Sequence, residues 1–202
     1  MNNKKVIKKG TILFLAGMLS ISAVAQDFPE KPYPPRLVND FAGMLKPEEI
    51  NALESKLVAF NDSTSTQIAI VTIDDLKGYN VADYAQRLAE KWGIGQKGSD
   101  NGMLLLVKPK TGSLQGEVTI QQGYGLEGVI PDITCAQIID NEIIPAFRNG
   151  QNYEGLDKAT TTLMALARGE FQADNYGKTK KNDLGALVPF IVIIIIVIII
   201  MS

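Results

Sequence analysis

The sequence predicts an α/β fold in which helices cover a single small mixed β-sheet, within one domain that spans residues 37–169. The first observation behind this prediction is that helix-type and strand-type apolar patterns follow one another there in the order helix, strand, helix, strand, strand, helix, helix. The second is that a helix separates the first two strands, which should therefore run parallel. The last two strands are close enough to form a hairpin. A chain of 202 residues suits one such domain with appendages.

The domain is expected to open with a loop, residues 37–45, whose apolar side chains enter the core while Asn39 and Asp40 face outward. A helix should follow over residues 47–60, because Pro47 suits a first helical turn and the two glutamates after it suit the positive end of the helix dipole. Its apolar positions at helical spacing are Ile50, Leu53, Leu57 and Phe60. The polar run at residues 61–65 should end this helix.

Strands are expected over residues 67–73, 103–108 and 117–121, which are apolar runs bounded by turn residues. Between the first two of them, residues 80–92 carry a helical apolar stripe that ends at Trp92, so this indole should belong to the core.

Two helices should complete the domain, over residues 133–148 and 153–168. Asp132 can cap the start of the first of these, and Pro145 should kink its last turn. Cys135 is expected to be buried there as a small apolar residue rather than to act in redox chemistry.

The two ends of the chain indicate export and membrane attachment. Residues 1–25 combine lysines, a short apolar run and Ala23-Val24-Ala25, the pattern of a secretory signal peptide, with an uncleaved anchor as the alternative. Residues 184–201 carry no charge and would reach roughly 27 Å as a helix, so they predict a transmembrane helix. The domain is therefore expected at a cell-envelope membrane, on the exported (periplasmic or extracellular) side.

Two linking segments flank the domain. Residues 26–36 hold four prolines in eleven positions and predict an extended, exposed leader, while the polar residues 170–183 predict a tether to the membrane helix. Lysines in this tether would lie on the exported side, against the positive-inside rule. Either the export signal overrides that rule, or the chain continues beyond Ser202 in a cytoplasmic tail.

The composition excludes several function classes. The sequence has no histidine, which removes serine–histidine and cysteine–histidine nucleophilic machinery and histidine zinc sites. A single cysteine permits neither an internal disulfide nor a thiolate zinc cage. A net charge of −2 without a basic stripe argues against nucleic-acid binding. Catalysis, if present, must use carboxylates, lysine or arginine, tyrosine, hydroxyls or a bound metal.

Oxygen-bearing side chains in the predicted loops suggest a small site for a hard cation or a phosphate. Asp40, Asp100, Glu127 and Asp132 lie beside amide side chains and Gly-rich backbone, and such oxygen groups are the ligands that calcium and magnesium prefer. The alternative is that each of them caps a helix or a turn.

The segment Gly123-Tyr124-Gly125-Leu126-Glu127-Gly128 literally matches the dinucleotide-binding fingerprint, but its context does not fit. It follows the third strand, and Val129-Ile130-Pro131 intervenes before any helix. These glycines are instead expected to serve backbone positions with positive φ.

Several motifs, in order along residues 36–168, resemble the TPM domain family. They are VNDxAGxL at 38–45, QIAIVT at 67–72, AxxWGIGxxGxDNGxLLL at 89–106, GYGLEG at 123–128 and Pro131-Asp132. The layout with a signal peptide and a hydrophobic helix is similar to that of YgcG-type bacterial members, although their glycine-rich tail after that helix is missing here.

The resemblance implies a helix-covered sheet with acidic loops at one edge that bind divalent cations, calcium in particular. Carried over residue by residue, it implies the metal ligands Asp40, Asp100, Asn101, Glu127 and Asp132. Relatives in plant thylakoids are linked to acid phosphatase activity and photosystem repair, and an animal relative modulates membrane receptors.

Two functions are therefore expected as alternatives. The favoured one is a membrane-tethered calcium-binding module that serves other envelope proteins in assembly, repair or modulation. The other is a metal-dependent, acid phosphatase-like hydrolase of phosphomonoesters, in which Asp100 or Asp132 would act on a metal-polarised substrate.

Overall fold

A computed structural model describes residues 28–95, 98–113 and 115–176 of the chain. The predicted signal peptide (1–25), the predicted membrane helix (184–201) and residues 177–183 of the predicted tether (170–183) lie outside these residues. Within the described residues, no helix has the length and apolar character that crossing a membrane requires.

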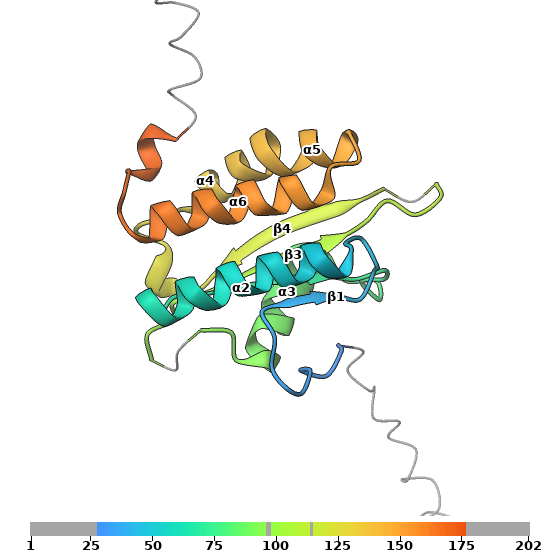
Figure 1. Cartoon of the computed structure of the whole chain (residues 1–202), viewed down its shortest axis with the longest axis horizontal. Coiled ribbons are helices and arrows are strands. Elements are labelled where there is room, and N and C mark those ends of the chain that lie inside the picture. The colour runs from blue at the N-terminus through green and yellow to red at the C-terminus, as the bar shows by residue number, and fades with distance from the viewer. Residues whose placement is uncertain (1–27, 96–97, 114, 177–202) are drawn as a thin grey trace, which may run out of the picture.

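The described strands form one four-stranded sheet in the order β1-β2-β3-β4 (Figure 1). Strand β2 (Gln67–Thr72) pairs in parallel with β1 (Val38–Asp40) and with β3 (Gly102–Lys108). Strand β4 (Glu117–Gln122) pairs with β3 as an antiparallel hairpin. The predicted mixed sheet, its parallel first pair and its hairpin are confirmed.

Strand β1 corrects the prediction that residues 37–45 are a loop throughout. The carboxylate of Glu54 accepts hydrogen bonds from the main-chain amides of Leu37 and Val38, and the carbonyl of Leu37 accepts one from Ile70. Asn39, which was expected to face outward, is only 6% exposed. A strand of three residues is too short to show an alternating pattern, and its pairing with β2 is what creates it.

The described helices follow the predicted order and differ from the prediction at their ends. Helix α2 (Pro47–Thr64) continues through the polar run that was expected to break it and ends at Ser65, whose φ is 61°. Its last turn is stabilised because the hydroxyls of Ser63 and Thr64 donate to the carbonyl of Phe60. Helix α3 (Val81–Trp92) begins after Asn80, whose side chain caps it.

The predicted helix over residues 133–148 consists of three consecutive segments, α4 (Asp132–Ile138), a π-helical turn η2 (Ile139–Ile143) and α5 (Ile144–Arg148). Pro145 follows the π-helical turn, as expected for a residue that lacks an N–H and crowds the preceding turn. Asp132 is the first residue of α4 and not its cap, which is Pro131. The last long helix is α6 (Asn152–Ala167), and short 3₁₀ turns occur at η1 (Tyr124–Leu126) and η3 (Ala173–Asn175).

Apolar side chains cover both faces of the sheet. One hydrophobic cluster joins it to α2, α4, η2 and α6, and the other joins it to α3. Alternate β3 residues belong to the two clusters, Leu105 to the first and Leu104 to the second, which explains its unbroken apolar run. Trp92 and Cys135 are buried, as predicted.

The start of the Pro-rich leader packs on α3 and is not an exposed extension. Phe28 is 7% exposed within the α3-side cluster. The indole N–H of Trp92 donates to the carbonyl of Pro29 at 2.9 Å, and Lys91 donates to the carbonyl of Phe28 at 3.0 Å. Only the later part matches the prediction, with Tyr33 96% exposed.

Candidate functional site

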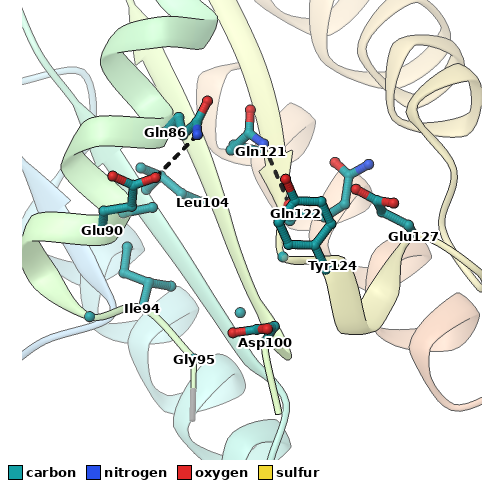
Figure 2. A pocket seen from close by; sticks show the side chains of 14 residues that line it. Gln86, Glu90, Ile94, Gly95, Asp100, Leu104, Gln121, Gln122, Tyr124 and Glu127 are labelled. Carbon is teal, nitrogen blue, oxygen red and sulfur yellow. Dashed lines mark hydrogen bonds between the residues drawn. The ribbon is translucent and has the colours of Figure 1, made fainter. Parts of the chain in front are cut away.

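An open cleft of about 510 Å³ lies between helix α3 and the segment that runs from the end of β4 into η1 (Figure 2). Helix α3 supplies one wall, and β4 with the residues after it supplies the other. Ile94 contributes apolar surface between these walls, above the fully buried Leu104. We call this feature the α3–β4 cleft.

Three carboxylates line the α3–β4 cleft: Glu90 on α3, Asp100 just before β3 and Glu127 just after η1. Glu90 accepts a hydrogen bond from the amide of Gln86 at 3.1 Å. The carboxylates of Asp100 and Glu127 make no side-chain hydrogen bond or ion pair to another described residue. Since none of the described lining residues is lysine or arginine, the cleft presents negative charge to whatever enters it.

The rim of the cleft carries amide and aromatic groups. Gln121 and Gln122 line it from β4, and the amide of Gln121 donates to the carbonyl of Gln122 at 3.4 Å. Tyr124 is 81% exposed, which is unusual for so large a side chain. The cleft therefore offers carboxylates, hydrogen-bonding amides and an aromatic face together.

Glycines allow the loops around the cleft to touch main chain to main chain. A Cβ on Gly123 would meet the carbonyl of Asp100, and a Cβ on Gly125 would meet that of Ser99, both closer than the 3.0 Å limit of real Cβ contacts. Two hydrogen bonds hold this contact, from the amide of Gly125 to the carbonyl of Asp100 at 3.1 Å and from the amide of Gly123 to the carbonyl of Gly102 at 2.8 Å.

This finding corrects the role that was expected for the glycine motif. Gly123 has φ of −77°, and neither Gly125 nor Gly128 has positive φ. Positive φ occurs instead at Asp100, where it is 46°. The glycines at 123 and 125 are required by close approach of the two loops.

Asp40 does not join the other predicted ligands. It pairs with Thr72 at the C-terminal end of β2, whereas Asp100 precedes Gly102, which pairs with Gln67 at the opposite end of that strand. Five residue steps along a strand separate these ends by roughly 17 Å. All five predicted ligands therefore cannot surround one ion, and the expectation of a single shared cluster is wrong for Asp40.

The carboxylate of Asp40 organises the connection to α2. It accepts hydrogen bonds from the main-chain amides of Met44 at 3.0 Å and Leu45 at 2.9 Å, and from the hydroxyl of Thr72. The same hydroxyl oxygen accepts a hydrogen bond from the amide of Ala42 at 3.0 Å. Asp40 has the turn-capping role that was the alternative reading of these carboxylates.

Asn101 and Asp132 lie near the cleft but do not line it. The side-chain amide of Asn101 donates to the carbonyl of Ser65 at 2.6 Å, at the C-terminal end of α2. Asp132 accepts a hydrogen bond from the side-chain amide of Gln122. The carbonyl of that amide accepts one from the thiol of Cys135 at 3.5 Å.

Burial, with a smaller contribution from the negative charge of Asp132, raises the pKa of the Cys135 thiol from its ordinary value of 9.0 to about 12. The thiolate is therefore disfavoured, and the thiol serves as a buried donor to Gln122. Within the described residues, no group of three or more aspartate, glutamate or cysteine side chains is arranged to hold a metal ion.

The structure thus brings Asp100 and Glu127 of the predicted ligands to one cleft and adds Glu90, which the sequence analysis did not identify. Glu90 lies on an exposed helix face, where a carboxylate ordinarily has only a solvating role. Its position on the same helical stripe as Gln86, one turn away, is the sole sequence signal that could have suggested it.

Comparison with known proteins finds a matching family model and solved structures of similar fold. The sequence model of the TPM domain matches residues 38–166. No curated protein matches the chain. A solution NMR structure of the N-terminal domain of a protein from P. gingivalis is similar at 32% sequence identity, with a TM-score of 0.59, over 67% of this chain and 83% of that chain.

An NMR structure of a protein from the psychrophilic bacterium Bizionia argentinensis is similar in fold, with a TM-score of 0.54 at 20% identity. This similarity covers 65% of the present chain and 87% of that chain. At this level of identity the likeness concerns the fold alone.

Proposed function

The chain belongs to the TPM domain family, and we propose that it is an exported, membrane-tethered module that binds a divalent cation, calcium in particular. In this role it serves other proteins of the cell envelope in their assembly, repair or modulation. The cation occupies the α3–β4 cleft, where Asp100 and Glu127 contribute carboxylate oxygens.

The observation that carries the cation proposal is the unpaired state of these two carboxylates. Most acidic side chains with a structural role in this domain accept hydrogen bonds, as Asp40 does from two main-chain amides. Asp100 and Glu127 instead face a cleft without a described basic residue, and make no side-chain hydrogen bond or ion pair within the described chain. Two like charges bordering one cavity are stabilised by a cation between them.

Fixed loops support the same proposal. Asp100 and the segment that leads to Glu127 are joined through the contact of Gly123 and Gly125 with the main chain of residues 99–102. A cation that binds carboxylates on two loops gains affinity when those loops are already held together, because less conformational entropy is lost on binding. Water and main-chain carbonyls supply the remaining ligands of a calcium ion, which takes six to eight oxygens.

Export and tethering rest on the sequence at the two ends, since residues 1–25 have the pattern of a signal peptide and residues 184–201 the length and composition of a membrane helix. The partner role follows from this location. A module held at the envelope surface meets the exported parts of other membrane proteins.

The hydrolase alternative has less support. A phosphomonoester carries negative charge, and the described lining of the cleft holds three carboxylates and no lysine or arginine. Asp132, one of the two candidate catalytic carboxylates, accepts a hydrogen bond from Gln122 and is not part of the cleft lining. Hydrolysis of p-nitrophenyl phosphate above a metal-only blank, lost in Asp100→Asn with the fold retained, would favour the enzyme over the binding module.

The test of the cation proposal is a calcium titration of the thermal stability of the full chain in detergent micelles. A ligand that prefers the native state stabilises it by about 2.7 kcal/mol at 100 times its Kd, which should raise Tm by roughly 10 °C for a domain of this size. Asp100→Asn and Glu127→Gln should each reduce this rise. Asp62→Asn and Glu154→Gln, which remove exposed charges on α2 and α6, should leave it unchanged.

Absence of a calcium-dependent rise in Tm would contradict the proposal. So would an equal rise in the double variant Asp100→Asn/Glu127→Gln, because calcium would then bind elsewhere. Magnesium in parallel tests selectivity, since its smaller, stricter octahedral shell is satisfied less readily than that of calcium by two carboxylates on separate loops.

A further inference from the structure

The α3–β4 cleft is larger than a metal ion needs. Calcium lies 2.3–2.6 Å from its oxygen ligands, so an ion and its shell occupy one end of a cleft of about 510 Å³. Cavities of this volume are in the range that holds organic ligands and anchoring side chains. The lining beyond Asp100 and Glu127 therefore requires an explanation of its own.

That lining combines apolar and aromatic surface with the third carboxylate. Ile94 is apolar and partly exposed, Tyr124 exposes 81% of its surface at the rim, and Glu90 lies on the wall formed by α3 (Figure 2). A long basic side chain has the complementary composition, because arginine and lysine carry a charged head on an apolar stem. An exposed tyrosine ring also attracts such a head through its π face.

We propose that the α3–β4 cleft binds a basic segment of a partner protein. In the calcium-free cleft, the guanidinium or ammonium group of an arginine or lysine in that segment lies among Glu90, Asp100 and Glu127, in place of the calcium ion of the proposed function. Its aliphatic stem packs on Ile94, and Tyr124 covers it from the rim. This inference names the partner chemistry of the proposed accessory role and rests on that part of the proposed function alone.

The negative charge of the cleft favours a basic protein segment over other classes of ligand. Nucleic acids, phosphorylated peptides and anionic lipid surfaces all bring negative charge to a cleft with three carboxylates and no described cationic lining residue, so they are repelled. A neutral apolar ligand would leave these carboxylates facing an uncharged surface, at a cost in desolvation.

A protein segment fits better than a free small amine because exposed apolar surface continues beyond the cleft. Val129, on the connection from β4 to α4 that carries Tyr124, is 42% exposed, and Ile133 on α4 is 66% exposed. Exposed aromatic and aliphatic side chains beside a charged cleft have the composition of a protein interface. The rest of the partner segment covers this surface once its basic side chain is inserted.

The test is fluorescence anisotropy with a short fluorescein-labelled peptide of alternating alanine and arginine, added to the full chain in micelles with EDTA present. The same peptide with glutamine in place of arginine is the ligand control. The arginine peptide should bind, the glutamine peptide should not, and raising the salt concentration should weaken binding by screening the charges.

Matched protein variants locate the binding. Glu90→Gln/Glu127→Gln should weaken it by roughly tenfold, as expected when two exposed ion pairs of up to about 1 kcal/mol each are lost. Glu48→Gln/Glu154→Gln, with the same net charge but substitutions at exposed positions on α2 and α6, should bind as the unmodified chain does. Tyr124→Ala should weaken binding by about 2- to 5-fold, and Tyr33→Ala, which removes another exposed tyrosine, should not.

The inference is overturned if the glutamine peptide binds as tightly as the arginine peptide. It is also overturned if Glu90→Gln/Glu127→Gln and Glu48→Gln/Glu154→Gln bind the arginine peptide equally well. These results are independent of calcium, because EDTA is present throughout. A chain that binds the peptide but shows no calcium-dependent rise in Tm would retain the inference and lose the cation half of the proposed function. A chain that shows the calcium-dependent rise in Tm but does not bind the peptide would retain the cation half of the proposed function and lose the inference.

Discussion

The main-chain amide of Gly125 donates a hydrogen bond of 3.1 Å to the carbonyl oxygen of Asp100. This bond joins the loop after β4 to the loop before β3, and so relates the positions of Glu127 and Asp100 in the lining of the α3–β4 cleft. The contact depends on the missing side chain at position 125, where a Cβ would overlap the carbonyl of Ser99.

Gly125→Ala should therefore disturb both stability and the cleft. The added methyl group forces the two loops apart, which should lower the free energy of unfolding by about 1–3 kcal/mol, as overpacking does. It should also reduce the calcium-dependent rise in Tm. Gly128→Ala is the matched control, because a Cβ there meets nothing within 4 Å, and it should stay within about 0.5 kcal/mol. Equal urea denaturation midpoints for the two variants would show that the loop contact is not required.

Asp40→Asn should show that Asp40 has a structural role and is not a ligand of the cation. An amide retains one carbonyl oxygen for the two main-chain amides and the hydroxyl that Asp40 now binds, so unfolding should become easier by about 1–3 kcal/mol. The calcium-dependent rise in Tm should persist in this variant. Urea denaturation with and without calcium measures both quantities, and loss of the calcium response in a folded Asp40→Asn protein would place this residue at the ion.

The Cys135 thiol should be inert in the folded protein. Because burial raises its pKa from 9.0 to about 12, almost no thiolate exists at pH 8, and iodoacetamide should react far more slowly with native than with guanidine-unfolded chains. Equal alkylation rates in the two states would contradict the burial of this thiol.

The same pKa difference predicts a pH effect on stability. A group with a raised native pKa contributes stability that is complete below its unfolded pKa of 9.0 and is lost as pH rises toward 12, because the unfolded state releases its proton first. Cys135→Ala should therefore show a smaller loss of stability between pH 9 and pH 12 than the unmodified chain. Comparing the two proteins removes the contribution of lysines and tyrosines that titrate in this range.

Tyr176 should hold the C-terminal end of the described domain against the helices. Its hydroxyl donates to the carboxylate of Glu142 at 2.6 Å, and the hydroxyl of Thr162 donates to the same carboxylate at 3.0 Å. Glu142 is only 7% exposed, so Tyr176→Phe leaves a buried acceptor short of a donor and should cost about 1–3 kcal/mol. Tyr33→Phe, at a 96% exposed position, should change the unfolding free energy by less than about 0.5 kcal/mol.

Much of the fold followed from local sequence patterns. Helix α3 and strands β2 to β4 agree closely with the predicted ranges, and the buried state of Trp92 and Cys135 was predicted from their helical positions. These features are local, because side-chain periodicity and turn residues reflect which face of an element is buried.

Other features needed partners that are distant in sequence. Strand β1 exists because Val38 pairs with Ile70, and the start of the leader is buried because Phe28 meets the ring of Tyr84. Neither relationship leaves a periodic signal in its own short segment. The roles of Gly123 and Gly125 were misjudged for the same reason, since a glycine required by a neighbouring loop looks in sequence like one required by its own backbone angle.

By itself, the sequence determined the class of fold, the family and the oxygen-rich character of the loops, because these depend on composition, periodicity and motifs that any segment carries in isolation. Only the tertiary structure decided that Asp100 and Glu127 share a cleft with Glu90 while Asp40 lies at the other end of the sheet. The physical reason is strand direction and register, which determine the edge at which each loop emerges and are set by pairing between segments far apart in the chain.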